Sequence, residues 1–128
     1  MKTKFELEYS FSCSISILYN RLSTPGGLAE WFAEDVNQKG KIFIFIWDNT
    51  EQQAEVLGKK ENKFIRFRWI DDEEAEEGAD YFEFKINQDE LTNDLALVIT
   101  DFAEEDEKND AIDLWDTQIA ELKHTIGL

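Results

Sequence analysis

The chain has 128 residues and a net charge of −16, with 13 basic residues against 29 acidic ones. This balance argues against nucleic acid as a partner, because polyanions are bound through clustered Lys and Arg, and it disfavours an anionic membrane surface. The charge suits a soluble protein and would also attract a basic protein partner. A single cysteine, Cys13, excludes an intrachain disulfide and indicates a reducing compartment, so we expect a cytoplasmic protein.

The first thirty residues predict a strand followed by two short helices. Residues 5–13 alternate apolar and polar side chains, which is typical of a half-buried strand and is unlike a secretion signal. Ser14 is placed to cap a helix over residues 15–22. Thr24 and Pro25 form a second start signal for a brief helix whose buried side ends with Trp31 and Phe32.

The middle of the chain predicts a run of strands. Residues 41–47 place three aromatic side chains on one face and three isoleucines on the other, which predicts cover on both sides for part of the strand. This is also the longest unbroken apolar stretch, and it is far shorter than the ~20 residues that a membrane-spanning helix needs. Further strands are expected at residues 53–59, 64–70, 81–86 and 91–100. Residues 71–77 contain six acidic side chains in seven and predict a solvated loop.

Residues 104–126 predict a long helix near the end of the chain. Ile112, Trp115, Ile119, Leu122 and Ile126 recur at helical spacing and form one apolar stripe. The predicted first turn is rich in acidic residues, which favours the helix dipole, and Gly127 is placed to end the helix. Docking this stripe on the apolar face of the strands buries both surfaces. We therefore expect one α+β domain over residues 1–128, with a curved antiparallel sheet of about six to seven strands around the helix.

The order of these elements resembles the helix-grip fold of the START-like superfamily, which includes lipid-transfer, Bet v-type and polyketide-cyclase proteins. Residues 16–32 carry the resemblance: a Leu-Tyr helix, then a Thr-Pro turn, then a Trp-Phe segment. Residues 67–69 and 115–127 are similar to the family's later strand and its C-terminal helix. The branch that fits best is homologous to activators of the ninety-kilodalton heat-shock chaperone's ATPase. The superfamily implies a ligand carrier, a co-chaperone or, more rarely, an enzyme.

Aromatic side chains are the main candidates for a binding site. The composition includes ten Phe and four Trp, and pockets for apolar ligands have largely aromatic and aliphatic walls. The alternative is that the same side chains fill the core at ordinary density. The residues expected to line a cavity between the sheet and the terminal helix are Trp31, Phe45, Trp47, Phe67, Trp69, Phe82, Phe84, Leu97, Trp115, Ile119 and Leu122.

The polar residues predict no reactive centre. His124 is the one histidine, and we expect it at the surface near the end of the helix. We expect Cys13 to be a small buried hydrophobic residue. One His and one Cys cannot build a common zinc site, and the acidic clusters lack the spacing of a calcium loop. We therefore expect no metal and no cofactor.

Three functions remain open at this point. The first is a non-enzymatic domain that binds a small hydrophobic ligand in the cavity. The second is a protein-interaction module, either a homodimer or a co-chaperone-like protein, motivated by the doubly apolar strand and the acidic surface. The third is an enzyme of the cyclase or hydrolase kind, which would need ionisable groups facing a pocket, and no such inward polar set is visible in the strands.

Overall fold

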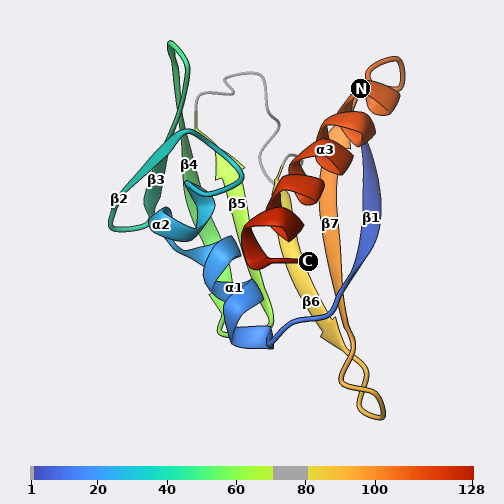
Figure 1. Ribbon diagram of the computed structural model, residues 1–128. Helices are drawn as coiled ribbons and strands as arrows, with labels where there is room; N and C mark the ends of the chain where they lie inside the picture. Colours follow the sequence, from blue (N-terminus) through green and yellow to red (C-terminus); the bar gives the residue numbers. More distant parts are fainter. Residues whose placement is uncertain (1, 71–80) are drawn as a thin grey trace.

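The computed structural model describes residues 2–70 and 81–128 (Figure 1). The acidic stretch 71–77 therefore lies outside the described residues. The elements follow one another as β1 (Thr3–Phe11), α1 (Ile15–Ser23), α2 (Pro25–Leu28), β2 (Asp35–Lys39), β3 (Ile42–Trp47), β4 (Thr50–Lys60), β5 (Phe64–Trp69), β6 (Phe82–Gln88), β7 (Leu95–Ala103) and α3 (Lys108–Ile126).

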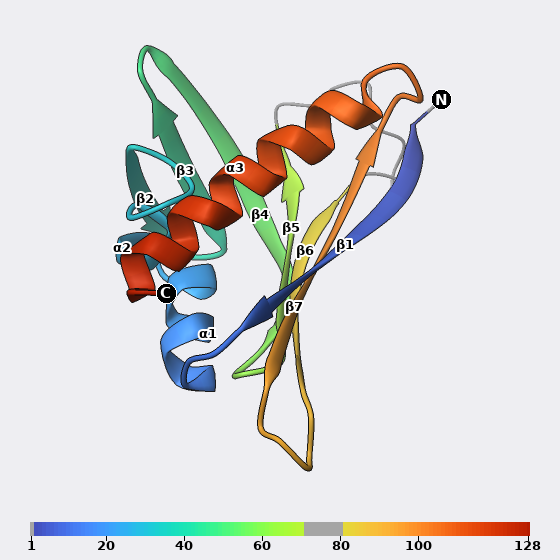
Figure 2. The same cartoon turned by 45° about the vertical axis from the view of Figure 1, so that its right-hand side comes forward.

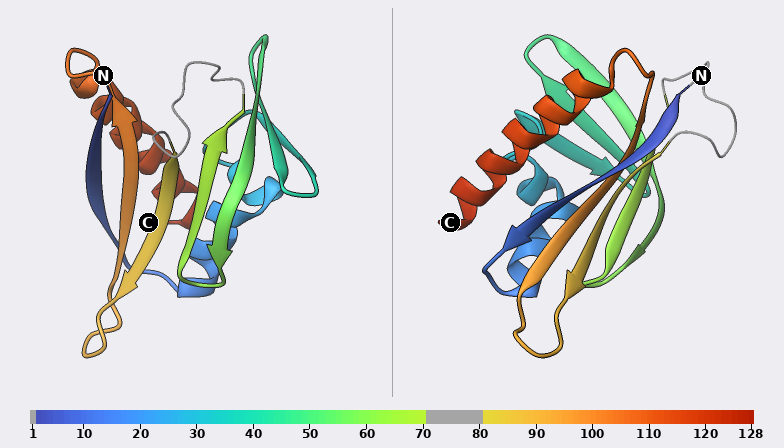
Figure 3. Two further views of the ribbon diagram at one scale, coloured as in Figure 1. Left: turned by 180° about the vertical axis from the view of Figure 1, so that it is seen from behind. Right: turned by 90° about the vertical axis from the view of Figure 1, so that its right-hand side faces the viewer.

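The described strands form one antiparallel sheet in the order β1-β7-β6-β5-β4-β3-β2. Neighbours in sequence are neighbours in space except at β1, which pairs with β7 along its whole length. The sheet is curved, and α3 crosses its concave side together with α1 and α2 (Figures 2 and 3). The predicted α+β helix-grip architecture is confirmed, with seven strands in the described part of the chain.

The two short helices begin where the sequence placed their caps. The Ser14 hydroxyl accepts a hydrogen bond from the Ile17 N–H at 3.3 Å, and the Thr24 hydroxyl accepts one from the Gly27 N–H at 3.0 Å. Helix α2 ends at Leu28, because the backbone then turns so that the N–H groups of residues 31–33 all donate to the Leu28 carbonyl. Trp31 and Phe32 are buried as expected, but they lie in this turn rather than on the helix.

The strands sort their side chains by face, as period-two alternation requires. In β5, Ile65 and Phe67 are fully buried, while Arg66 and Arg68 lie outside and pair with glutamates of neighbouring strands. In β3 the phenylalanines are buried, but the isoleucines at 42, 44 and 46 stay partly exposed. The predicted cover on both faces of β3 is therefore wrong for the described residues: the convex side of the sheet carries no layer of helices (Figure 3).

Strand β7 begins at Leu95, four residues later than predicted. The Asp89 carboxylate accepts hydrogen bonds from the N–H groups of Leu91 and Thr92 at 2.8 and 3.1 Å, which lowers the pKa of this exposed carboxyl. Asn93 adopts a φ of 63°. These two residues close a turn between β6 and β7, so Leu91 is left 95% exposed instead of entering the strand.

Helix α3 begins at Lys108, so the predicted start at residue 104 was too early. Residues 105–107 form a turn instead, in which the Glu107 N–H donates to the Glu104 carbonyl at 2.9 Å. Of the predicted stripe, Trp115, Ile119 and Leu122 are buried, while Ile112 and Ile126 pack against the core from its margin. Gly127 ends the helix with a φ of 92°, a left-handed conformation that favours glycine.

Candidate functional site

A hollow of about 170 Å³ lies between the first half of α3 and the inner face of the sheet. Its described walls come from six parts of the chain: the turn after α2, the ends of β3 and β5, the start of β6, strand β7 and helix α3. The lining residues are Phe32, Trp47, Trp69, Phe82, Asp101, Ala111, Leu114, Trp115 and Gln118. We call this hollow the aromatic pocket, because five of these residues carry aromatic rings.

The aromatic walls hold one another in place. Phe32 stands between the sheet and the helix, stacked on Phe82 and on Trp115 with ring centroids 5.9 Å apart in both cases. Trp69 contacts Phe82 at 5.0 Å and Trp47 at 6.2 Å. Such pairs contribute about 0.5–1.5 kcal/mol each beyond the area they bury, which stabilises this arrangement of the walls.

Two indole N–H groups fix the outer tryptophans. The Trp47 N–H donates to the Phe32 carbonyl at 2.8 Å, which ties β3 to the turn after α2. The Trp115 N–H donates to a carboxylate oxygen of Asp101 at 2.9 Å, which ties α3 to β7. The other Asp101 oxygen accepts the Phe102 N–H at 2.8 Å. The carboxylate at the pocket wall is therefore held in a fixed position.

The structure divides the predicted cavity residues into two groups. Trp47, Trp69, Phe82 and Trp115 line the aromatic pocket. The others are closed into the hydrophobic core, each at most 6% exposed: Trp31, Phe45, Phe67, Phe84, Leu97, Ile119 and Leu122. The pocket and the filled core thus occur side by side rather than as alternatives.

Sequence reasoning missed several pocket residues, most notably Asp101. Strand β7 points Leu95, Leu97 and Ile99 inward, and the same alternation places Asp101 on the inner face. Extending the predicted strand by a single residue would have revealed this inward carboxylate. Phe32, Ala111, Leu114 and Gln118 also line the pocket and were not predicted to do so.

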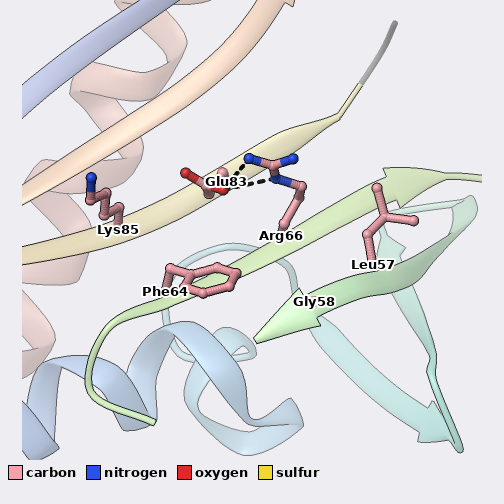
Figure 4. Close-up of a pocket in the computed structure, with 6 residues that line it drawn as sticks. All are labelled: Leu57, Gly58, Phe64, Arg66, Glu83 and Lys85. Atoms are coloured by element: carbon pink, nitrogen blue, oxygen red, sulfur yellow. Dashed lines mark hydrogen bonds and ion pairs between the residues drawn. The ribbon is translucent and has the colours of Figure 1, made fainter. Parts of the chain in front are cut away.

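A second, more open hollow lies on the convex side of the sheet (Figure 4). It measures about 510 Å³ and lies beside a bulge between Val56 and Gly58, where the register of β4 against β5 shifts. Arg66 and Glu83 span its floor with an ion pair of 2.8 Å, and Leu57, Phe64 and Lys85 complete the wall. Because the guanidinium already pairs with a carboxylate and the hollow faces solvent broadly, this groove is a weaker candidate site than the aromatic pocket.

The isolated reactive residues lie away from both hollows. His124 is exposed in the last turn of α3, as predicted. Cys13 is half-buried just beyond β1, where burial raises the pKa of its thiol and makes it a poorer nucleophile. Among the described residues, no group of His, Cys, Asp and Glu is arranged to hold a metal ion. None of the described helices combines the length and the apolarity that crossing a bilayer requires.

Comparison with known proteins places the whole chain in one family. The START-like superfamily domain matches residues 1–128. The solution structure of BfR322 from Bacteroides fragilis is 42% identical, covers 99% of this chain and 93% of that chain, and superimposes with a TM-score of 0.71. No curated protein matches significantly.

More distant structures share the fold alone. The Aha1 dimer from Colwellia psychrerythraea is 18% identical over 94% of this chain and 93% of that chain, with a TM-score of 0.78. MLL2253 from Mesorhizobium loti is 17% identical over 97% of this chain and 96% of that chain, with a TM-score of 0.76. The family match over every residue, together with the sheet-and-helix geometry, shows that this chain belongs to the START-like superfamily.

Proposed function

We propose that this protein is a non-enzymatic START-like domain that binds a small, largely apolar ligand in the aromatic pocket. The observation that carries the proposal is the convergence of five aromatic side chains from distant segments on one partly enclosed space. At the rim of this space Trp47 and Trp69 stay partly exposed, whereas the core closes fully around the neighbouring Phe45, Phe67 and Phe84.

The size of the pocket limits the ligand to a compact one. The volume of about 170 Å³ is close to the roughly 150 Å³ of an engineered apolar cavity that holds benzene. It is well below the ~300–1,000 Å³ of typical drug-sized sites. A single ring or a short branched group would fill it, whereas a two-chain lipid would require the helix to move.

The composition of the wall supports binding rather than catalysis. Acid–base chemistry needs at least two ionisable groups aimed at one substrate. Asp101 is the one ionisable side chain among the described residues that line the pocket, and one of its oxygens accepts the Trp115 N–H. Gln118 adds a neutral polar group, which can orient a ligand but cannot exchange a proton at neutral pH.

Filling the pocket tests the proposal. Ala111 lines the pocket from α3, and Ala120 is exposed on the same helix. We expect Ala111→Leu to abolish binding of benzene-sized probes, followed by NMR shifts of the indole N–H signals, while Ala120→Leu binds as the wild type does. If neither the wild type nor Ala120→Leu shifts these signals with any of a set of single-ring compounds at millimolar concentration, the proposed function is wrong.

A second candidate function is homodimerisation, favoured by the isoleucine stripe of β3. Ile42, Ile44 and Ile46 are partly exposed side by side on the convex face. Polar residues of β2 and β4 flank them in register, so the stripe has the apolar centre and polar rim of a small interface. A second copy of this chain could cover it.

Sedimentation analysis distinguishes this candidate from a monomer. We expect the wild type to dimerise with rising concentration and Ile44→Glu to stay monomeric. Leu91→Glu, in the exposed turn between β6 and β7, is the matched control and should dimerise normally. A wild type that stays monomeric at several hundred micromolar would eliminate the dimer.

A further inference from the structure

We propose that the open hollow on the convex face of the sheet is a docking site for an acidic peptide segment of a partner protein, a segment that carries an apolar residue between its carboxylates. The site is separate from the aromatic pocket, so the inference does not depend on the proposed function. It follows from the shape of the hollow, from the aromatic ring in its wall and from the charges on either side of that ring.

The hollow lies where the bulge of β4 leaves little side-chain volume. Gly58 carries no side chain, and a Cβ atom built there would have the Phe64 Cε2 as its nearest neighbour, at 3.6 Å. Leu57 lies in the bulge itself and is 45% exposed. The volume of about 510 Å³ falls within the ~300–1,000 Å³ of common ligand sites, which enclose most of a small molecule. Because this hollow is open along one side, it suits an extended chain better than a compact molecule.

Phe64 gives the hollow an apolar anchor point. Period-two alternation turns its side chain to the face opposite the fully buried Ile65, and it stays partly exposed there. Its ring and the Leu57 side chain both contribute to the lining of the hollow (Figure 4). An aliphatic or aromatic side chain placed between them would cover apolar surface that both residues now expose to water, which favours association.

Two lysines flank the ring in register. Lys60 pairs with Phe64 across the β4–β5 ladder, and Phe64 pairs with Lys85 across the β5–β6 ladder. Because neighbouring strands lie about 4.8 Å apart, the two lysine Cα atoms are roughly 10 Å apart, one on each side of the ring. Both lysines are exposed, and neither ammonium group forms an ion pair within the described part of the chain. Carboxylates on both sides of an apolar residue would match this row.

The surrounding segment is basic in a chain that is otherwise strongly acidic. Residues 58–68 hold five basic residues and one acidic residue, against 13 and 29 in the whole chain. Arg66 and Arg68 already pair with glutamates of neighbouring strands, so the lysines are the charges that a ligand can reach. At physiological ionic strength the Debye length is about 8 Å, which screens the more distant acidic residues. The local surplus of positive charge therefore decides which peptide is attracted.

The decisive experiment uses the fluorescein-labelled peptide Asp-Glu-Leu-Phe-Glu-Asp, followed by fluorescence anisotropy at about 150 mM salt. A comparison peptide has the same charges but carries Ser in place of Leu and Phe. We expect the parent peptide to bind at least about tenfold more tightly than the comparison peptide, because only the parent can insert an apolar side chain beside Phe64. Equal binding of the two would overturn the proposal, and so would a parent peptide that does not bind at millimolar concentration.

Removing charges from the protein tests the same contact from the other side. Lys60→Gln with Lys85→Gln removes both flanking charges at exposed positions, and we expect this double variant to bind the parent peptide about fivefold more weakly. Lys4→Gln with Lys39→Gln removes the same charge from the two edge strands and should change the affinity by less than about twofold. Equal affinities of the two double variants would contradict the proposal.

NMR mapping on the wild type locates the peptide without any substitution. We expect the amide signals that shift on addition of the parent peptide to belong to residues 57–66 and 83–87, which surround the hollow. Shifts centred on the aromatic pocket or on the isoleucines of β3 would place the peptide elsewhere and overturn the proposal, even if the affinity is high.

Discussion

Replacing Gly27 by alanine should destabilise the fold strongly, while the same change at its neighbour should not. A Cβ atom at position 27 would lie 2.7 Å from the Arg21 Cα and 2.8 Å from the Thr24 hydroxyl oxygen, and closer still to the Asn20 carbonyl oxygen. Non-bonded carbon atoms prefer separations of about 3.5–4.0 Å. Two of the three contacts are backbone atoms of α1, so no side-chain rotation relieves them.

The cost follows from those contacts. Overpacking of this kind costs about 1–3 kcal/mol. Displacing the Thr24 hydroxyl also weakens the cap of α2, which adds about 1 kcal/mol. We therefore expect Gly27→Ala to lower the free energy of unfolding by about 2–4 kcal/mol, and the melting temperature by roughly 10 °C for a chain of this size.

Gly26→Ala is the matched control. It adds a methyl group one residue away, where nothing lies within 4 Å of the new atom. Since alanine restricts the unfolded chain more than glycine does, this variant should be neutral or more stable by up to about 1 kcal/mol. Urea unfolding followed by far-ultraviolet circular dichroism measures both. A Gly27→Ala free energy of unfolding within ~0.5 kcal/mol of the wild type would refute the steric argument.

Three further predictions follow from side-chain partners. The Tyr9 hydroxyl donates to the Asp116 carboxylate at 2.6 Å and links β1 to α3. Tyr9→Phe should therefore lower the free energy of unfolding in urea by about 0.5–1.5 kcal/mol. An unchanged free energy of unfolding would mean that this hydrogen bond is absent in solution. Burial raises the pKa values of Tyr9 and Tyr19 above the ordinary 10.0 and that of Cys13 above the ordinary 9.0, and for Tyr9 the neighbouring Asp116 adds to the effect. As the pH rises, the unfolded chain therefore loses these protons at a lower pH than the folded chain does. Thermal stability should therefore hold level below about pH 8.5 and fall as the pH rises above 9, and a profile that rises there would contradict these shifts. Trp115→Phe keeps a ring in the pocket but removes the indole N–H that donates to Asp101, and we expect a loss of about 1–2 kcal/mol in urea unfolding, with a smaller loss in Asp101→Asn. The reverse order would show that the carboxylate, and not the indole donor, carries the stability.

The architecture could be predicted from sequence because its determinants are local. Ser14, Thr24 and Pro25 mark helix starts through short-range hydrogen bonds and backbone restriction, and each acts as the sequence indicated. The apolar stripe from Ile112 to Ile126 indicates which face of the helix is buried. The alternation in β5 and β6 does the same for these strands. Such signals need no knowledge of the partner surface.

The pocket could not be predicted in the same way, because it depends on how closely elements that are distant in the sequence pack against one another in the fold. Trp47 and Phe45 lie two residues apart on the same face of β3, yet one lines the pocket and the other is fully buried. What separates them is the path of α3 across the sheet, which no local pattern encodes. Asp101 is the exception, since period-two alternation alone would have turned it inward.

The pairing of β1 with β7 sets the timing of folding on the ribosome. Among the described strands, β1 emerges before the others and pairs with residues 95–103, so it waits while the strands between them are synthesised. Contacts of such long separation close slowly, and the aromatic side of the half-made sheet stays open meanwhile. We therefore expect this domain to be most exposed to chaperones, proteases and other nascent chains just before α3 is made.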